Sequence, residues 1–229
     1  MEIGGLQRVS LIEYPHRICA VIFTRGCNFR CPYCHNPELV DPNLYASLIP
    51  EGEVYSFLEK RRGKLDAVTI TGGEPTLQAD LARAVRRMKD MGYRVKVDTN
   101  GSRPDIVEEL TRDHLVDYIA MDIKGPLHKY RSLAGVDISV SDIRRSIETI
   151  AASGIEYEFR TTVARSMLTE RDLDEIGDLI RGARLYVLQR FVPAKVLDQR
   201  FLSQTTFTEE EFTAVRRKLE KRISRVAVR

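Results

Sequence analysis

The stretch RGCNFRCPYCHNP, residues 25–37, decides how the rest of the chain is interpreted. It contains three cysteines, Cys27, Cys31 and Cys34, within eight consecutive positions. Thiolates at this spacing can point into one small cavity. A 4Fe–4S cluster is held by thiolates and normally takes four of them. A local set of three therefore favours a cluster in which one iron is left open to a further ligand.

A zinc site is the alternative that the same residues allow. Structural zinc takes four ligands, commonly from two separated pairs of Cys or His, and the chain has no second Cys pair. His35 would complete a Cys3His set, although four ligands so close in sequence are unusual. The fourth cysteine, Cys19, lies in the apolar run 18–23, where a buried, inert thiol is expected. No apolar leader precedes the cysteines, so we expect free thiols rather than disulfides.

Composition places the chain among ordinary globular proteins. It has 229 residues, 43% hydrophobic and 30% charged, with a net charge of +3. Such a weak charge gives no case for nucleic-acid binding, and no apolar run is long enough to span a membrane. We expect a cytoplasmic protein in a reducing setting. We also expect a single domain over residues 1–229, with its core at about 16–195 and a helical extension at about 205–229.

The hydrophobic pattern alternates between short apolar runs and longer amphipathic stretches. The amphipathic stretches predict helices near residues 51–62, 77–91 and 141–152, and another after Thr169, with Asp172 as its acid at the third helical position. The short runs are rich in β-branched and aromatic residues and predict strands. They are Ile18–Thr24, Ala67–Thr71, Arg94–Asp98, Tyr118–Asp122, Tyr157–Val163 and Leu185–Phe191.

Six strands alternating with helices predict parallel βαβ units. Six are too few for a closed eight-stranded barrel, so the predicted fold is α/β, an open partial (β/α)6 barrel. In such folds active sites gather where strands end and helices begin. Polar motifs follow each predicted strand in turn. They are the cysteine loop, Thr71–Pro75, Asp98–Gly101, Asp122–Gly125, Arg160 within the fifth strand, and Gln189–Phe191.

The cysteine motif resembles the cluster loop of the radical S-adenosylmethionine superfamily, whose pattern is CxxxCxxC with an aromatic residue before the last Cys. Tyr33 is that aromatic residue. The longer stretch 26–39 is similar to activating enzymes of glycyl-radical enzymes. The stretch GLQRVSLIEYP, residues 5–15, is similar to one branch of them, the anaerobic ribonucleoside-triphosphate reductase activating proteins. The resemblance covers roughly residues 4–195.

This resemblance implies a radical SAM-type partial barrel and a reaction. Cys27, Cys31 and Cys34 would hold a 4Fe–4S cluster whose fourth iron binds S-adenosylmethionine. A flavodoxin- or ferredoxin-like donor would supply one electron, and cleavage of S-adenosylmethionine would give a 5′-deoxyadenosyl radical. The radical would abstract hydrogen from a glycine of a partner glycyl-radical enzyme, with anaerobic ribonucleotide reductase as the expected partner.

The resemblance also implies which residues contact the cofactor. Gly72 and Gly73 would let the backbone approach it closely, and Glu74 would accept hydrogen bonds from its ammonium group. Two-pronged donation by a guanidinium suits its carboxylate. The full set of implied contacts is Tyr33, Gly72, Gly73, Glu74, Asp98, Asp122, Lys124 and Arg160. Asp98, Thr99 and Asp122 would also hold a monovalent cation.

Other interpretations remain for these motifs. Gly-Gly-Glu-Pro and Asp-Thr-Asn-Gly are good turn and cap sequences in their own right. A compact radical enzyme acting on a small molecule, similar to carboxy-deazaguanine synthases, is an alternative function, and a zinc-binding module is a third. Two positions depart from the resembled pattern. His16 replaces a Gly, and Gln189 lies where a cofactor-contacting His is expected.

Overall fold

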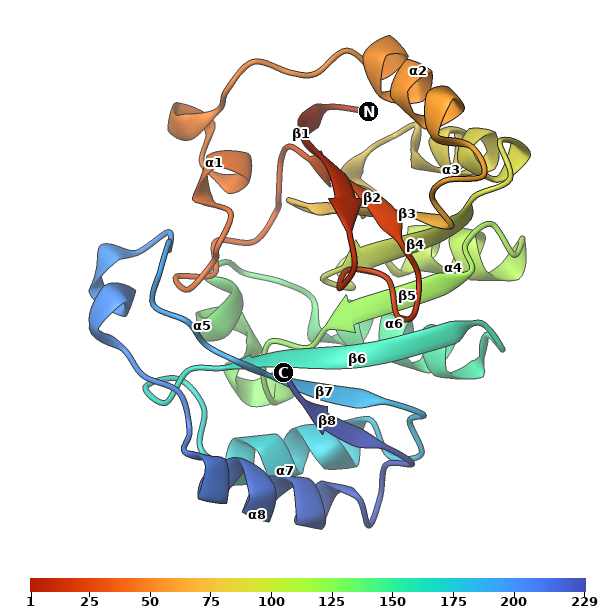
Figure 1. The fold of residues 1–229 in the computed structure, drawn as a ribbon. Helices are drawn as coiled ribbons and strands as arrows, with labels where there is room; N and C mark the ends of the chain where they lie inside the picture. The colour runs from red at the N-terminus through yellow and green to blue at the C-terminus, as the bar shows by residue number, and fades with distance from the viewer.

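The computed structural model describes residues 1–229 and is built around one eight-stranded sheet (Figure 1). The strands lie side by side in sequence order, from β1 to β8. All neighbouring pairs from β2 to β8 are parallel, and only β1 runs antiparallel to its neighbour β2. The strands are β1 Ile3–Ser10, β2 Cys19–Thr24, β3 Ala67–Gly72, β4 Arg94–Thr99, β5 Tyr118–Asp122, β6 Glu156–Val163, β7 Tyr186–Arg190 and β8 Val226–Val228.

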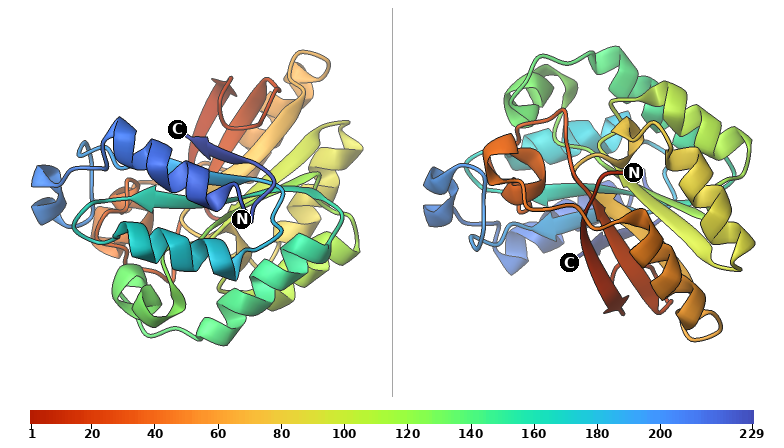
Figure 2. Two further views of the ribbon diagram at one scale, coloured as in Figure 1. Left: turned by 90° about the horizontal axis from the view of Figure 1, so that it is seen from below. Right: turned by 90° about the horizontal axis from the view of Figure 1, so that it is seen from above.

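The sheet is curved and does not close, because β1 and β8 pair with no strand on their outer sides. Helices lie outside the curve (Figures 1 and 2). No helix has the length and apolar character that crossing a membrane needs. The helices are α1 Pro37–Val40, α2 Glu51–Arg61, α3 Leu81–Asp90, α4 Pro104–Arg112, α5 Tyr130–Ala134, α6 Val140–Ala152, α7 Glu170–Leu179 and α8 Glu209–Leu219, with short 3-10 turns η1 Pro42–Leu44, η2 Pro75–Leu77, η3 Leu127–Lys129 and η4 Gln199–Ser203.

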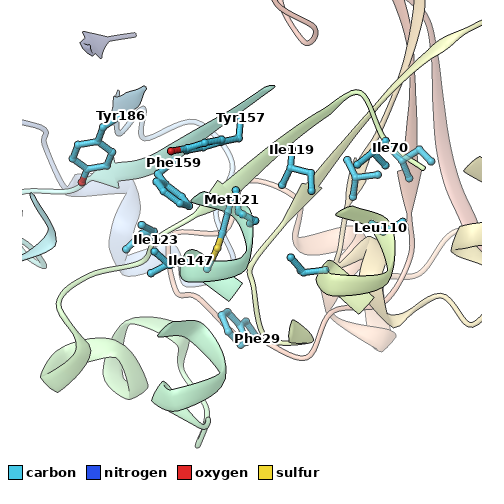
Figure 3. Close-up of a cluster of buried hydrophobic side chains, with 14 of the residues drawn as sticks. Phe29, Ile70, Leu110, Ile119, Met121, Ile123, Ile147, Tyr157, Phe159 and Tyr186 are labelled. Carbon is cyan, nitrogen blue, oxygen red and sulfur yellow. The ribbon is translucent and has the colours of Figure 1, made fainter. Parts of the chain in front are cut away.

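The alternation of side chains along each strand separates two environments. Residues that point outward, such as Ile119 and Met121 of β5 and Phe159 of β6, pack under the helices in the main apolar core (Figure 3). Their neighbours point into the barrel. Near the start of the strands these inner residues are apolar, as with Val21 and Tyr118. Near the ends of the strands they become polar and charged, which places the site at that end.

All six predicted strands are present, with boundaries that differ by one residue at most. The helix after Thr169 is also confirmed, with the expected capping box between Thr169 and Asp172. The helix predicted near 77–91 is shorter, because a 3-10 turn at Pro75 comes before α3. The prediction missed β1 and β8. The expected helical extension therefore contains α8 and then a strand that joins the sheet beside β7.

Candidate active site

The cysteine loop follows β2 and is fixed by contacts from distant parts of the chain. The Arg30 amide donates to the Ala134 carbonyl of α5 at 2.7 Å, and the Asp198 amide donates to the Pro32 carbonyl at 2.9 Å. Figure 1 shows α1, α5 and the segment after β7 at the same end of the sheet as this loop. The loop is therefore held by α1, which follows it directly, and by two regions that lie far from it in the sequence.

The Gly72–Gly73 pair lies directly against the start of the cysteine loop. The Gly73 amide donates to the Thr24 carbonyl, and the Glu74 amide donates to the Gly26 carbonyl, both at 2.8 Å. Gly72 has φ of +108°, and a Cβ there would lie 2.6 Å from the Thr24 nitrogen. A Cβ on Gly73 would overlap the Gly26 carbonyl. These glycines therefore allow the two loops to approach each other, in addition to the approach to a cofactor that the sequence predicted.

The carboxylate of Glu74 is 1% exposed and is fully engaged within the protein. It accepts hydrogen bonds from the Thr76 amide and hydroxyl, from the Thr99 hydroxyl at 2.7 Å, and from the Asn100 amide at 2.6 Å. Burial raises the pKa of this carboxyl, and the hydrogen bonds from these groups oppose the shift. The side chain that was predicted to accept from an ammonium group thus joins the loop after β3 to the loop after β4.

Asn100 links that junction to the first cysteine. Its side-chain Nδ2 lies 3.9 Å from Cys27 Sγ and 3.0 Å from Asn28 Oδ1. The Phe29 amide also approaches Cys27 Sγ, at 3.4 Å. Hydrogen bonds to a ligand sulfur tune a metal cluster. The sequence analysis did not single out Asn100, although it lies in the Asp98–Gly101 motif that was predicted at this rim.

A buried ionic network lies beside the thiols, centred on Arg160 of β6. Its Nε donates to Asp122 Oδ1 at 2.8 Å and its Nη1 donates to Asp98 Oδ2 at 3.1 Å. Lys96 Nζ donates to Asp98 Oδ1 at 2.6 Å, and Lys124 Nζ donates to Asp122 Oδ2 at 3.2 Å. Two carboxylates are therefore shared among three cations. Lys96, which the sequence analysis missed, is 1% exposed and points inward from β4.

The charges in this network determine the pKa values of its acids. Burial alone would raise the pKa of Asp122, but Arg160 and Lys124 outweigh it and hold that pKa well below its usual range. The pKa of Asp98 is lowered in the same way, with burial opposed by Arg160 and Lys96. Both acids are therefore ionised at neutral pH, and the network carries a surplus of positive charge suited to a carboxylate ligand.

The thiols and the network line one cavity of about 320 Å³. Every predicted site residue faces it, so the structure brings together residues from β2, β3, β4, β5 and β6 and the loops that follow them. Those residues are Cys27, Cys31, Tyr33, Cys34, Gly72, Gly73, Glu74, Asp98, Asp122, Lys124 and Arg160. Glu13, which the sequence analysis did not select, also lines the cavity, as do His35 and Gln189.

The donor set fits a 4Fe–4S cluster with three protein ligands. All four cysteines are free, and only the three of the loop face the cavity, whereas Cys19 is buried elsewhere. Burial raises the pKa of the Cys27 thiol to about 12 and raises that of Cys31 and Cys34, and metal binding deprotonates such thiols. No three Cys, His, Asp or Glu side chains are grouped around a single ion position. A cluster does not need that grouping, because each thiolate binds its own iron.

Comparisons with known proteins agree with this site. The model of the radical SAM superfamily matches residues 21–181. A protein of Methanocaldococcus jannaschii, provisionally named a glycyl-radical enzyme activating enzyme, is 32% identical over 233 residues, which cover 99% of this chain and 95% of that protein. The 7-carboxy-7-deazaguanine synthase of Methanothermobacter thermautotrophicus is 36% identical over 106 residues, but these cover only 45% of this chain and 41% of that enzyme.

A solved structure supports the same fold. The crystal structure of a domain of the pyruvate-formate lyase-activating enzyme from Bacteroides vulgatus superimposes with a TM-score of 0.56. The match covers 70% of this chain and 98% of that domain, at 18% sequence identity. At this identity the likeness concerns the fold, and it supports the open, partial barrel that was expected from the strand count.

Proposed function

The chain belongs to the radical S-adenosylmethionine superfamily, and on that premise we propose that it activates a glycyl-radical enzyme by hydrogen abstraction from one of its glycines. The family implies a 4Fe–4S cluster and S-adenosylmethionine as cofactors. The observation that carries the proposal is a single cavity lined by three free thiols and by the Arg160 network. The full-length similarity to a protein with that provisional name supports the same branch.

Each group in the cavity has a part in this proposal. Cys27, Cys31 and Cys34 would hold the cluster, which, once reduced by the external donor, would supply the one electron needed to cleave S-adenosylmethionine. Arg160 and Lys124 bind the cofactor carboxylate, because they carry the surplus positive charge. Gly72 and Gly73 hold the backbone of the adjoining loop close to the cysteine loop.

Tyr33 and Glu74 complete the proposed cofactor site, and both line the cavity. Tyr33 is 6% exposed and its ring lies 6.4 Å from that of Phe201, so it forms part of an apolar wall next to the last cysteine. An apolar wall of this kind helps to exclude water from a reactive site. Glu74 keeps the loops after β3 and β4 in register through buried hydrogen bonds.

A monovalent cation near Asp98 and Asp122 belongs to the same proposal. Both carboxylates are already paired with Arg160. A cation would therefore take the place of one pairing when the cofactor carboxylate draws Arg160 or Lys124 toward itself. Measuring S-adenosylmethionine affinity in potassium and in tetramethylammonium salts tests this point. Equal affinity in the two salts would argue against the cation.

We also propose which glycyl-radical enzyme is activated and which kind of protein donates the electron. Similarity of residues 5–15 to one branch favours anaerobic ribonucleotide reductase as the activated enzyme and a flavodoxin- or ferredoxin-like protein as the electron donor. The sheet is open between β1 and β8, and a barrel with an open side suits a polypeptide segment as substrate. A small-molecule substrate, as in carboxy-deazaguanine synthases, is the second candidate, supported by the local match to such an enzyme.

The first test is anaerobic reconstitution with iron and sulfide, followed by dithionite and S-adenosylmethionine. Wild type is expected to form 5′-deoxyadenosine, detected by mass. Cys31→Ala should form none, while Cys19→Ala is the matched control and should behave as wild type because Cys19 lies outside the cavity. A colourless wild type that holds one zinc and leaves S-adenosylmethionine intact would overturn the proposal.

The second test addresses the partner. Reconstituted wild type, mixed anaerobically with an anaerobic ribonucleotide reductase from the same source, should give a glycyl-radical signal in electron paramagnetic resonance. The signal should be absent when the reactive glycine of the reductase is replaced by alanine. Cleavage of S-adenosylmethionine with no radical on the reductase would keep the family chemistry and reject this partner.

A further inference from the structure

Beneath the cofactor-facing network lies a second buried acid, Glu158. It precedes Arg160 by two residues on β6, so that both side chains point into the barrel, with Glu158 one layer deeper. Only 1% of Glu158 is exposed. A carboxylate this deeply buried is unfavourable unless hydrogen bonds and an opposite charge compensate it. The groups that pair with Glu158 therefore affect the charged network around Arg160, which lies one layer above it.

Arg229 supplies that compensation. Its Nη1 donates to Glu158 Oε1 at 3.2 Å and its Nη2 donates to Glu158 Oε2 at 3.1 Å, a two-pronged pairing. The Tyr118 hydroxyl adds a third hydrogen bond, to Oε2 at 3.2 Å. The backbone of Arg229 is fixed on β7, since its amide donates to the Leu188 carbonyl and its carbonyl accepts from the Arg190 amide. The backbone pairing of Arg229 with β7 therefore places its guanidinium beside Glu158.

Glu158 also lies close enough to compete for Arg160. Arg160 Nη1 is 3.9 Å from Glu158 Oε1, while the same nitrogen is 3.1 Å from Asp98 Oδ2. Three carboxylates therefore surround one guanidinium, and each of them also has a second cation. Glu158 is the one whose second cation pairs with both of its oxygens, and it is also the one farthest from Arg160. Removing Arg229 would leave Glu158 with Tyr118 and Arg160 as its only polar partners.

We propose that Arg229 is a positioning residue for the cofactor site. By neutralising Glu158, it leaves the Arg160 guanidinium directed at Asp98 and Asp122, at the level of the thiols. The inference rests on the proposed function only in taking Arg160 as a contact of the S-adenosylmethionine carboxylate. Arg229 itself does not line the cavity and acts only through Glu158.

Three variants test the proposal: Arg229→Gln, Glu158→Gln and the double variant. Arg190→Gln is the matched control, because Arg190 lies on the adjacent strand and pairs with the exposed Glu209. With cluster content matched, Arg229→Gln should weaken S-adenosylmethionine binding about tenfold in equilibrium dialysis, as is common for residues that support a ligand shell. The double variant should recover wild-type affinity within about twofold, because the competing carboxylate is gone.

The recovery distinguishes positioning from general support of the fold. If Arg229→Gln binds as tightly as Arg190→Gln, or if the double variant stays as weak as Arg229→Gln, the proposal is wrong. A second readout does not depend on the cofactor. In a crystal structure of Arg229→Gln without cluster, Arg160 should lie within hydrogen-bond distance of Glu158 and should have left Asp98.

An unchanged Arg160 in that structure would overturn the inference even if the wild type binds S-adenosylmethionine. Conversely, a wild type that fails to bind S-adenosylmethionine would overturn the proposed function. The position of Arg160 in the variant would still show whether Arg229 keeps that guanidinium away from Glu158. The two failures are therefore distinguishable. The melting temperature of each variant without cluster shows whether it is folded. The Arg229 side chain is 46% exposed, but Glu158 is buried, so Arg229→Gln should melt at a lower temperature than the double variant.

Discussion

Glu74 accepts a hydrogen bond from the Asn100 backbone amide at 2.6 Å, across two loops that follow neighbouring strands. Asn100 in turn brings its side-chain amide to 3.9 Å from Cys27 Sγ. A buried carboxylate thus controls the position of a group that approaches the thiol of Cys27, a proposed cluster ligand. This relationship gives the Gly-Gly-Glu sequence a role in shaping the protein, beside its proposed contact with a cofactor.

Glu74→Gln should destabilise the protein and weaken its hold on iron. A glutamine amide would place a donor against groups that are themselves donors, at a position that is only 1% exposed. We expect a loss of about 1–3 kcal/mol in the free energy of unfolding. Iron retention during gel filtration should fall as well. Glu59→Gln, on the exposed side of α2, is the control and should leave both unchanged; an equal effect from both variants would reject this role.

Gly73→Ala tests the close approach of the two loops. A Cβ at this position would overlap the Gly26 carbonyl, and backbone atoms cannot move aside as a flexible side chain can. We expect destabilisation of about 1–3 kcal/mol, typical of overpacking, and loss of cluster binding. Gly52→Ala is the matched change, since nothing lies within 4 Å of a Cβ there and the residue is in helix α2. That variant should be slightly more stable, by roughly 0.5–1 kcal/mol. Thermal unfolding measures both.

Arg160→Gln should change the stability of the cluster-free protein in a pH-dependent way. In the wild type, the pKa values of Asp98 and Asp122 are below their usual range. Their contribution to stability is therefore present above the unfolded value of about 4 and is lost as the pH falls through the lowered values. Without Arg160, both pKa values should rise relative to the wild type, because only Lys96 and Lys124 then oppose the effect of burial.

The sign of the effect follows from that change. Acids whose folded pKa is higher than in the wild type lose less stability as the pH falls, so the penalty of Arg160→Gln should be largest at pH 7 and smaller at pH 5. At pH 7 we expect a loss of about 3 kcal/mol, as for other broken buried ion pairs. Urea unfolding at the two pH values measures it. Arg165→Gln, which breaks a surface pair with Glu211, should show no such trend; a penalty that grows on acidification would contradict the argument.

His16→Gly should stabilise the protein. His16 has φ of +60° in the turn Tyr14–Arg17, which is closed by a hydrogen bond from the Arg17 amide to the Tyr14 carbonyl. With Pro15 before it, this turn has the pattern of type II, whose third position favours glycine. Relief of the left-handed conformation outweighs the added freedom of glycine in the unfolded chain, so we expect a gain of up to about 1 kcal/mol.

His128→Gly serves as the comparison for that change. His128 lies in the 3-10 turn η3 and has no positive φ, so glycine there relieves no strain. It adds freedom to the unfolded chain and removes the contact between His128 and Glu175. This variant should be less stable than wild type in thermal unfolding. If the two glycine variants shift the melting temperature in the same direction, the strain assigned to His16 is absent.

The strands that hold the site were predictable from sequence because they are short runs rich in β-branched and aromatic residues and are bounded by turn residues. β1 was not, since Gly4 and Gly5 break its pattern and Gln7 and Arg8 are exposed along its free edge. β8 has three residues, too few to give a periodic signal. Edge strands of these kinds form because they pair with a neighbouring strand. Their own residues do not indicate which strand that is.

A similar limit applies to the site. The rim residues were predictable because each follows a recognisable strand. Lys96 was not, because a lysine in a strand is usually exposed, and only the partner Asp98 on the inner face explains its burial. Glu158 and Arg229 were hidden for the same reason. They are 71 positions apart, and nothing local in either segment indicates that they form a pair.

The cysteine loop has a consequence for the order of events during synthesis. Its three thiols are translated within eight residues of one another, long before the segments at Ala134 and Asp198 that hold the loop in place. A nascent chain therefore exposes all three thiols while most of their enclosure is still missing. Iron and sulfide can reach the thiols at that stage, but so can oxidants. Shelter from oxygen is most important in the interval before the segment beyond β7 has been made.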